Sequence, residues 1–160
     1  MLGRPDAVVV VCDAACLERN LNLVLQVLEI SSKVVVCVNL LDEAKKRGVT
    51  VRLKALSKKL GLPVVGTVAK TGRGIKELVA AVEKTVAAPE SPGFKVPYPK
   101  MVEQAVTQLQ KLPLPSLLPG RFLALKLLEQ DPLMLESLKQ NGGADCFKGK
   151  TQAAVLNTLN

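Results

Sequence analysis

Asn39 and Asp42 follow directly on an apolar run, residues 34–38, and their side chains are suited to reading a purine base. The run is typical of a strand that helices bury on both faces. Small ligands of open α/β sheets bind just beyond the carboxyl ends of such strands. The Asp42 carboxylate can accept two N–H bonds from the edge of guanine, which adenine does not offer, and Asn39 can both donate and accept. Taken alone, the pattern fits either guanine recognition or a strand end with Asp42 capping the next helix, and it favours the capping residue.

Two more strand-like segments, residues 6–14 and 62–66, flank this motif, and residues 17–21 and 67–75 follow them with most of their polar side chains. An Asn-x-x-Asp after a strand is the guanine-reading element of P-loop GTPases. In detail the chain resembles the ferrous iron transport protein B (FeoB) family, in which segments of the form "VDA…LERNL", "NMMDEA" and "TSA..G.GI" occur in this order. The resemblance covers roughly residues 5–86. A weaker one, through the family's "R.LALKLLE.D" element at residues 121–131, continues to about residue 131.

The resemblance also implies which residues bind the nucleotide. Leu40 stands where most GTPases have Lys, so that stacking on the base would be apolar. The backbone N–H of Ala69 would meet the guanine oxygen, and Val68 replaces the usual Ser of that loop. Lys70 would pack over the sugar or the base. The nucleotide-binding residues implied in this way are Asn39, Leu40, Asp42, Thr67, Val68, Ala69 and Lys70.

The phosphate-binding part of such a site is not found ahead of the first strand. A GTPase holds its phosphates with a Gly-rich loop and a lysine, and places a Thr and an Asp around Mg²⁺. In the family these elements precede the segment at residues 6–14, where only Met1 to Arg4 stand. The resemblance therefore implies a fragment that retains contacts to the base of GTP or GDP, with no catalytic residues and no GTP hydrolysis of its own. The resemblance implies Mg²⁺ as a cofactor only for full-length members of the family.

Two other functions remain open. Residues 144–151, which end in Gly149-Lys150-Thr151, fit a loose phosphate-loop pattern with Ala for the first Gly, as in a circularly permuted or stand-alone GTPase. A phosphate loop follows a buried strand, however, and this segment follows a helix-like tail and a turn, which favours coincidence. The chain could also be a non-catalytic interaction fragment whose loops bind nothing.

Charge and composition limit the kinds of molecule that this chain could bind. The net charge is +8, and residues 45–59 carry seven basic side chains and no acidic one. Such a segment is either a solvated helix face or a surface drawn to an anionic membrane leaflet. Aromatic residues make up 2% of the chain, too few for stacking on nucleic acid. No run is long enough for a membrane span. The resemblance implies a membrane transport domain as partner and the cytoplasmic face of the cell membrane as location.

The cysteines do not indicate a metal site. Cys12, Cys16, Cys37 and Cys146 lack metal-ligand spacing, and the chain has no histidine. Two of them lie inside apolar runs, where free cysteine behaves as a small hydrophobe. We therefore expect a reduced compartment and no metal ligands.

The order of the elements predicts an α/β fold, the second half of a P-loop GTPase with a doubly wound, mostly parallel sheet, followed by a small helical domain. Strands are expected at 7–12, 34–38 and 63–66, with amphipathic helices between them, an alternation that calls for right-handed crossovers. A shift to Pro and Gly marks a boundary. The predicted parts are a partial GTPase domain at 1–88, a linker at 89–99 and a helical domain at 100–160.

Overall fold

The structure, a computed structural model, describes residues 5–89, 96–111, 118–129, 132 and 136. The chain divides into two compact units, residues 1–95 (unit 1) and residues 96–160 (unit 2). Unit 1 holds the predicted motifs. The predicted boundaries at residues 88 and 100 remain predictions.

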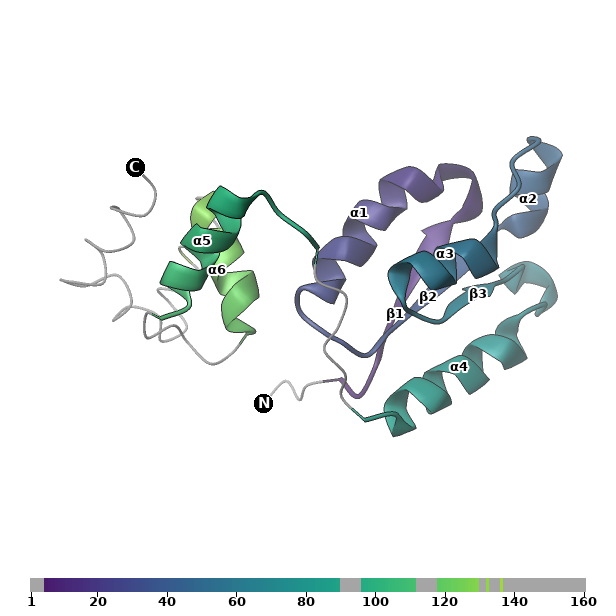
Figure 1. Ribbon diagram of the computed structural model, residues 1–160. Coiled ribbons are helices and arrows are strands. Elements are labelled where there is room, and N and C mark those ends of the chain that lie inside the picture. Colours follow the sequence, from purple (N-terminus) through teal and green to yellow (C-terminus); the bar gives the residue numbers. More distant parts are fainter. Residues whose placement is uncertain (1–4, 90–95, 112–117, 130–131, 133–135, 137–160) are drawn as a thin grey trace. The chain divides into compact units, whose positions relative to one another are not determined.

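Unit 1 is built on a three-stranded parallel sheet in the order β1-β2-β3 (Figure 1). The strands are β1 (Val8–Asp13), β2 (Val34–Asn39) and β3 (Val64–Gly66). Both pairings are parallel, as the alternation of strand and helix predicted. Because the strands run the same way, their polar carboxyl ends meet at one edge of the sheet.

Helices cover both faces of this sheet. Val24 and Leu28 of α1 pack with the β2 side chains of Val36 and Val38 in the main core, and α3 adds Leu60 to it. Helix α4 contacts β2 and β3 and lies on the other side of the sheet from α1 (Figure 1). No helix in the described ranges is long and apolar enough to cross a membrane. The helical segments of unit 1 are η1 (Ala14–Cys16), α1 (Leu17–Leu28), α2 (Leu41–Lys46), α3 (Leu53–Leu60), η2 (Ala69–Thr71) and α4 (Ile75–Ala87).

The two long strands differ in burial although both are rich in valine. Residues 34–38 of β2 are all buried, as expected of a central strand. In β1, burial alternates, and Val9 and Val11 are 38% and 60% exposed. Strand β1 is the edge of the sheet, and only one of its faces is covered by α1.

Helix α4 departs from its predicted packing. The spacing of Ile75, Leu78, Val82 and Val86 predicts an inward stripe, but Ile75 and Val86 are 38% and 39% exposed and no residue of α4 is fully buried. The prediction was wrong at the two ends of the helix. Helix α4 has 13 residues, and the two strands that it contacts, β2 and β3, have six and three, so the sheet covers only part of its length.

Unit 2 contains a pair of helices, α5 (Lys100–Leu109) and α6 (Gly120–Glu129), in its described part. Val106 and Leu109 pack against Leu123 and Leu127. An ion pair joins the two helices, and both of its partners also contact the segment that leads into α5.

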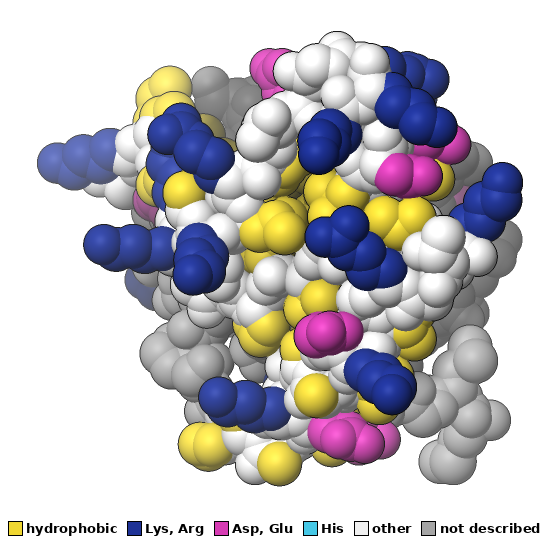
Figure 2. All heavy atoms as spheres, turned by 90° about the vertical axis from the view of Figure 1, so that its right-hand side faces the viewer, with side chains coloured by type: hydrophobic (Ala, Val, Ile, Leu, Met, Phe, Trp, Pro, Cys, Tyr) yellow, Lys and Arg dark blue, Asp and Glu magenta, His cyan; other side chains and the backbone are white. Residues whose placement is uncertain are grey.

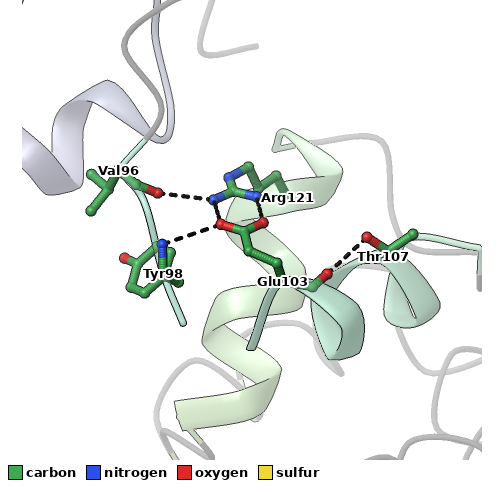
Figure 3. Close-up of polar contacts among 5 residues, drawn as sticks. All are labelled: Val96, Tyr98, Glu103, Thr107 and Arg121. Carbon is green, nitrogen blue, oxygen red and sulfur yellow. Dashed lines mark hydrogen bonds and ion pairs between the residues drawn. The ribbon is translucent and has the colours of Figure 1, made fainter. Parts of the chain in front are cut away.

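The ion pair is bidentate (Figure 3). Arg121 Nη1 lies 2.7 Å from Glu103 Oε2, and Arg121 Nη2 lies 2.8 Å from Glu103 Oε1. Arg121 Nη2 also donates to the Val96 carbonyl at 3.2 Å, and the Tyr98 N–H donates to Glu103 Oε1 at 3.3 Å. A planar guanidinium matches a carboxylate in this geometry, so one arginine fixes both helices and the entering chain.

Candidate functional site

The predicted residues at the ends of β2 and β3 come together through one amide oxygen. Asn39 Oδ1 accepts hydrogen bonds from Thr67 Oγ1 at 3.0 Å and from the Ala69 N–H at 3.1 Å. The Thr67 N–H in turn donates to the Val38 carbonyl at 2.8 Å. Asn39 therefore ties the strand end at residues 39–42 to the loop at residues 67–70, as expected of a residue that joins neighbouring loops.

The Asn39 amide is oriented by these bonds. Because its oxygen accepts both bonds within the protein, its nitrogen, Nδ2, points away from the two donors. No hydrogen bond from Nδ2 is found within the described ranges. The Ala69 N–H, which the resemblance assigns to the guanine oxygen, donates here to Asn39 instead. A base oxygen at that position would have to take this N–H from Asn39.

A third polar group lies beneath this pair. Cys37 Sγ lies 3.3 Å from Thr67 Oγ1. Both side chains are buried, and Thr67, at 1% exposure, is the only buried polar residue in the part of the chain that the structure describes. The predictions from sequence treated Cys37 as a small hydrophobe and missed this contact, because residues 30 positions apart give no signal of their proximity.

Leu40 has left-handed backbone geometry, with φ 62°. It is the N-cap of α2, and its carbonyl accepts from the Ala44 N–H at 3.0 Å. Asp42 is therefore the second residue of α2 and not its cap, so the alternative interpretation of Asp42 as a capping residue is wrong. Its carboxylate is exposed at the start of the helix.

A pocket of about 550 Å³ opens beside Asp42. Figure 2 looks onto this side of the molecule, where Lys and Arg side chains lie around smaller apolar patches. Arg73 comes from the loop before α4, and its carbonyl accepts from the Val68 N–H at 3.0 Å, which fixes its position. Lys70 is exposed and lies outside this lining. The pocket is lined by Leu41, Asp42, Lys45, Lys46 and Arg73.

The loop at residues 67–74 is held against the sheet. Val68 is 5% exposed, so an apolar side chain fits where the family has Ser. Gly74 has φ 83°, and a Cβ there would lie 2.2 Å from the Gly66 carbonyl oxygen. Only glycine tolerates both the positive φ and the short distance to the Gly66 carbonyl. The loop therefore packs closely against the end of β3, from which it starts.

The polar residues at the end of β1 make local contacts. Asp13 Oδ1 accepts from the Ala15 N–H at 2.7 Å and caps η1. Asn20 Oδ1 accepts from the Asp13 N–H at 3.1 Å, and Asn20 Nδ2 donates to the Cys16 carbonyl at 3.0 Å. Asn20, to which no role could be assigned from the sequence, thus closes the turn between β1 and α1.

Positive charge is concentrated on one segment. All seven basic side chains of residues 45–59 are exposed. The remainder of residues 5–89 has six basic and eight acidic side chains, so this segment carries the excess. Two of its lysines line the pocket beside Asp42. Within the described ranges no three His, Cys, Asp or Glu side chains lie together as a metal site.

A parallel sheet with these strand-end motifs, followed by a helical unit, defines a G domain with an appended helical domain. A family model described as "Ferrous iron transport protein B" matches residues 1–82, and one described as "FeoB cytosolic helical domain" matches residues 98–157. The chain belongs to the ferrous iron transport protein B family.

Known relatives share much of this chain. The Fe(2+) transport protein A/Fe(2+) transporter FeoB fusion protein of Porphyromonas gingivalis is 39% identical over 142 residues, which cover 82% of this chain and 16% of the relative. The Fe(2+) transporter FeoB of Escherichia coli K12 is 38% identical over 132 residues, 81% of this chain and 17% of the relative. The chain thus spans about a sixth of the length of these relatives.

Solved structures agree with the fold. An NFeoB mutant from S. thermophilus bound to GDP has a TM-score of 0.83 and 28% identity, with 98% of this chain and 58% of that chain covered. The cytosolic domain of the T. maritima FeoB iron transporter in a GDP form has a TM-score of 0.78 and 27% identity, with 99% and 61% covered. The predicted α/β class with a following helical domain is confirmed.

Proposed function

We propose that unit 1 recognises the base of GTP or GDP as part of the cytoplasmic region of a ferrous iron transporter. The observation that carries the proposal is the double hydrogen bond to Asn39 Oδ1, which joins the two loops that the sequence motifs predict. The oriented amide and the exposed Asp42 carboxylate are held together at the carboxyl edge of the sheet, where ligands of such folds bind.

Each residue has a distinct part in this proposal. Asn39 Nδ2 donates to an acceptor atom of the base, and Asp42 accepts from the N–H groups on the guanine edge. The side chains of Leu40 and Lys70 pack against the base and sugar. The remaining loop residues, Thr67, Val68 and Ala69, keep the loop in place, and on binding the Ala69 N–H would pass from Asn39 Oδ1 to the guanine oxygen.

The excess positive charge of residues 45–59 suits the anionic membrane leaflet beneath which the parent protein would hold this domain. Lys45, Lys46 and Arg73 line the pocket beside Asp42, but the proposed contacts to the base involve none of them. Mg²⁺ accompanies the nucleotide in the full-length family, and contacts to the base alone do not require it.

The parent protein is proposed from the relatives. Those from P. gingivalis and E. coli are named as Fe(2+) transporters, and the T. maritima structure is of a cytosolic domain. We therefore infer a membrane transport domain as the partner, with nucleotide binding on its cytoplasmic side. Within this chain we assign residues 1–88 to the G domain, 89–99 to a linker and 100–160 to the helical domain.

Replacing Asp42 tests the proposal. The Asp42→Asn variant should lose about ten- to a hundredfold in guanosine affinity, because a hydrogen bond to a charged group is removed. Its affinity for xanthosine should rise, since that base presents an acceptor where guanine has a donor. Glu43→Gln removes the same charge one residue away and is the matched control. Calorimetry that shows equal GDP and ADP binding by the unsubstituted chain would contradict the proposal.

A comparison of guanosine with GDP tests the rival phosphate loop. Strands β1, β2 and β3 end in Asp13, Asn39 and Gly66, and the residues that follow each strand do not match the phosphate-loop pattern Gly-x-x-x-x-Gly-Lys-Ser/Thr. This chain should therefore bind guanosine and GDP with similar affinity and hydrolyse no GTP. The segment Gly149-Lys150-Thr151 lies outside the described residues. Tighter, Mg²⁺-dependent GDP binding that Lys150→Ala abolishes would favour the permuted GTPase.

A further inference from the structure

Three polar side chains form a line of hydrogen bonds beneath the proposed base site. Cys37 Sγ lies 3.3 Å from Thr67 Oγ1, and Thr67 Oγ1 lies 3.0 Å from Asn39 Oδ1. Cys37 and Thr67 are 4% and 1% exposed, so water does not compete for these bonds. The line connects the interior of β2 to the amide at its end.

The direction of the protons along this line follows from the groups themselves. An amide oxygen only accepts, so the single hydroxyl proton of Thr67 is donated to Asn39 Oδ1. Thr67 Oγ1 then has only lone pairs to offer the sulfur. The Cys37 S–H must therefore be the donor in the remaining contact.

We propose that Cys37 is a positioning residue for base recognition. Its thiol donates to a lone pair of Thr67 Oγ1, so that the hydroxyl proton is left for Asn39 Oδ1 and Asn39 Nδ2 faces the ligand. This inference rests on the guanine recognition proposed above and adds to it the buried group that orients the amide.

When the base binds, the orientation of the Asn39 amide depends more strongly on the contact between Cys37 and Thr67. In the ligand-free chain Asn39 Oδ1 has two donors, Thr67 Oγ1 and the Ala69 N–H. When a guanine oxygen accepts the Ala69 N–H, the Thr67 hydroxyl is the donor to Asn39 Oδ1 that remains among the described residues. The orientation of the amide then depends on the hydroxyl that Cys37 holds.

Composition does not distinguish the role of Cys37 from packing, because β1 also carries one buried cysteine, Cys12, after four valines. The feature that sets Cys37 apart is the contact of its sulfur with Thr67 Oγ1.

Two substitutions of equal size separate the two roles. Cys37→Ser keeps a donor, and Cys37→Ala removes it, while both leave a similar space. We expect calorimetry on the full chain to give Cys37→Ser a guanosine affinity close to that of the unsubstituted chain and Cys37→Ala one about threefold or more lower, the loss of one weak hydrogen bond. Equal affinities for the two variants would overturn the proposal.

A second measurement does not depend on binding. The NMR signals of the Asn39 side-chain NH₂ in the ligand-free protein report the orientation of the amide. They should be alike in the unsubstituted chain and in Cys37→Ser, and shifted in Cys37→Ala or, should that variant not fold, in Cys37→Val. Identical signals in all variants would overturn the role of Cys37. If the unsubstituted chain bound no guanosine, the proposed function would fail, and these signals would still test the contact.

Discussion

Strands β1 and β2 are almost the same in sequence and differ in what surrounds them. Each has six residues, mostly valine with one cysteine and a polar residue at the end. Every apolar residue of β2 is buried, whereas Val9 and Val11 of β1 are exposed because β1 is the edge of the sheet. The burial of an apolar strand therefore follows from its place in the sheet and cannot be read from its composition.

The polar ends of the two strands differ in the same way. Asp13 and Asn39 are partners in the parallel register. Asp13 accepts from Ala15, two residues ahead, whereas Asn39 accepts from Thr67 and Ala69, which follow another strand. The central strand has a neighbour on each side, so its end can join loops, while the end of the edge strand serves its own turn.

A charge placed in each strand should give the largest contrast. Val36→Asp buries a carboxylate at a position with 0% exposure, and we expect a loss of more than about 4 kcal/mol in the free energy of unfolding, or no folding. Val11→Asp, at 60% exposure, should change it by less than about 1 kcal/mol. Urea denaturation followed by circular dichroism measures both.

The same pair tests the nature of the edge. A charge on an exposed edge strand opposes pairing with another chain, so Val11→Asp should also lower self-association in analytical ultracentrifugation. Equal destabilisation by the two substitutions would mean that the outer face of β1 is covered in solution.

Replacing the polar residues at the two strand ends, Asn39 and Asp13, should give a smaller contrast. One substitution should change the affinity for guanosine and the other the free energy of unfolding. Asn39→Ala should lower guanosine affinity by about tenfold or more, because an oriented donor is lost and the Thr67 hydroxyl is left without its acceptor. Asp13→Ala should lower the free energy of unfolding by about 1 kcal/mol, the usual effect of losing a cap, and leave guanosine affinity unchanged. A loss of guanosine affinity in Asp13→Ala would contradict the division between the two ends.

The smallest effect is expected from pH. Burial raises the pKa of the Cys12 thiol above its ordinary value of 9.0, and the nearby Cys37 adds to the increase. The native state therefore favours the protonated thiol, and the free energy of unfolding should fall as the pH rises past 9.0, where the unfolded thiol loses its proton. Denaturation at several pH values should show this slope reduced in Cys12→Ala. Val10→Ala, also buried in β1, should keep it; a slope lost in both variants would argue against Cys12 as its source.

The sequence was sufficient for the strands and their parallel order. Continuous apolar runs separated by amphipathic helices leave few other arrangements, and Asn39 and Thr67 meet because parallel strands end at one edge. The exposed ends of α4 and the contact of Cys37 with Thr67 could not be predicted. The exposure of α4 depends on how far the neighbouring strands extend, and the contact of Cys37 depends on which residue lies beside it in space. Hydrophobic periodicity indicates neither of these.

The left-handed backbone at Leu40 places Asn39 and Asp42 a fixed distance apart. A single residue with positive φ joins the end of β2 to the start of α2, so no flexible loop separates the amide from the carboxylate. The conformational entropy of holding the two groups in place is therefore lost when the chain folds and not when a ligand arrives. A pre-organised pair binds more tightly than the same two groups on a mobile loop, because association then has fewer degrees of freedom to freeze.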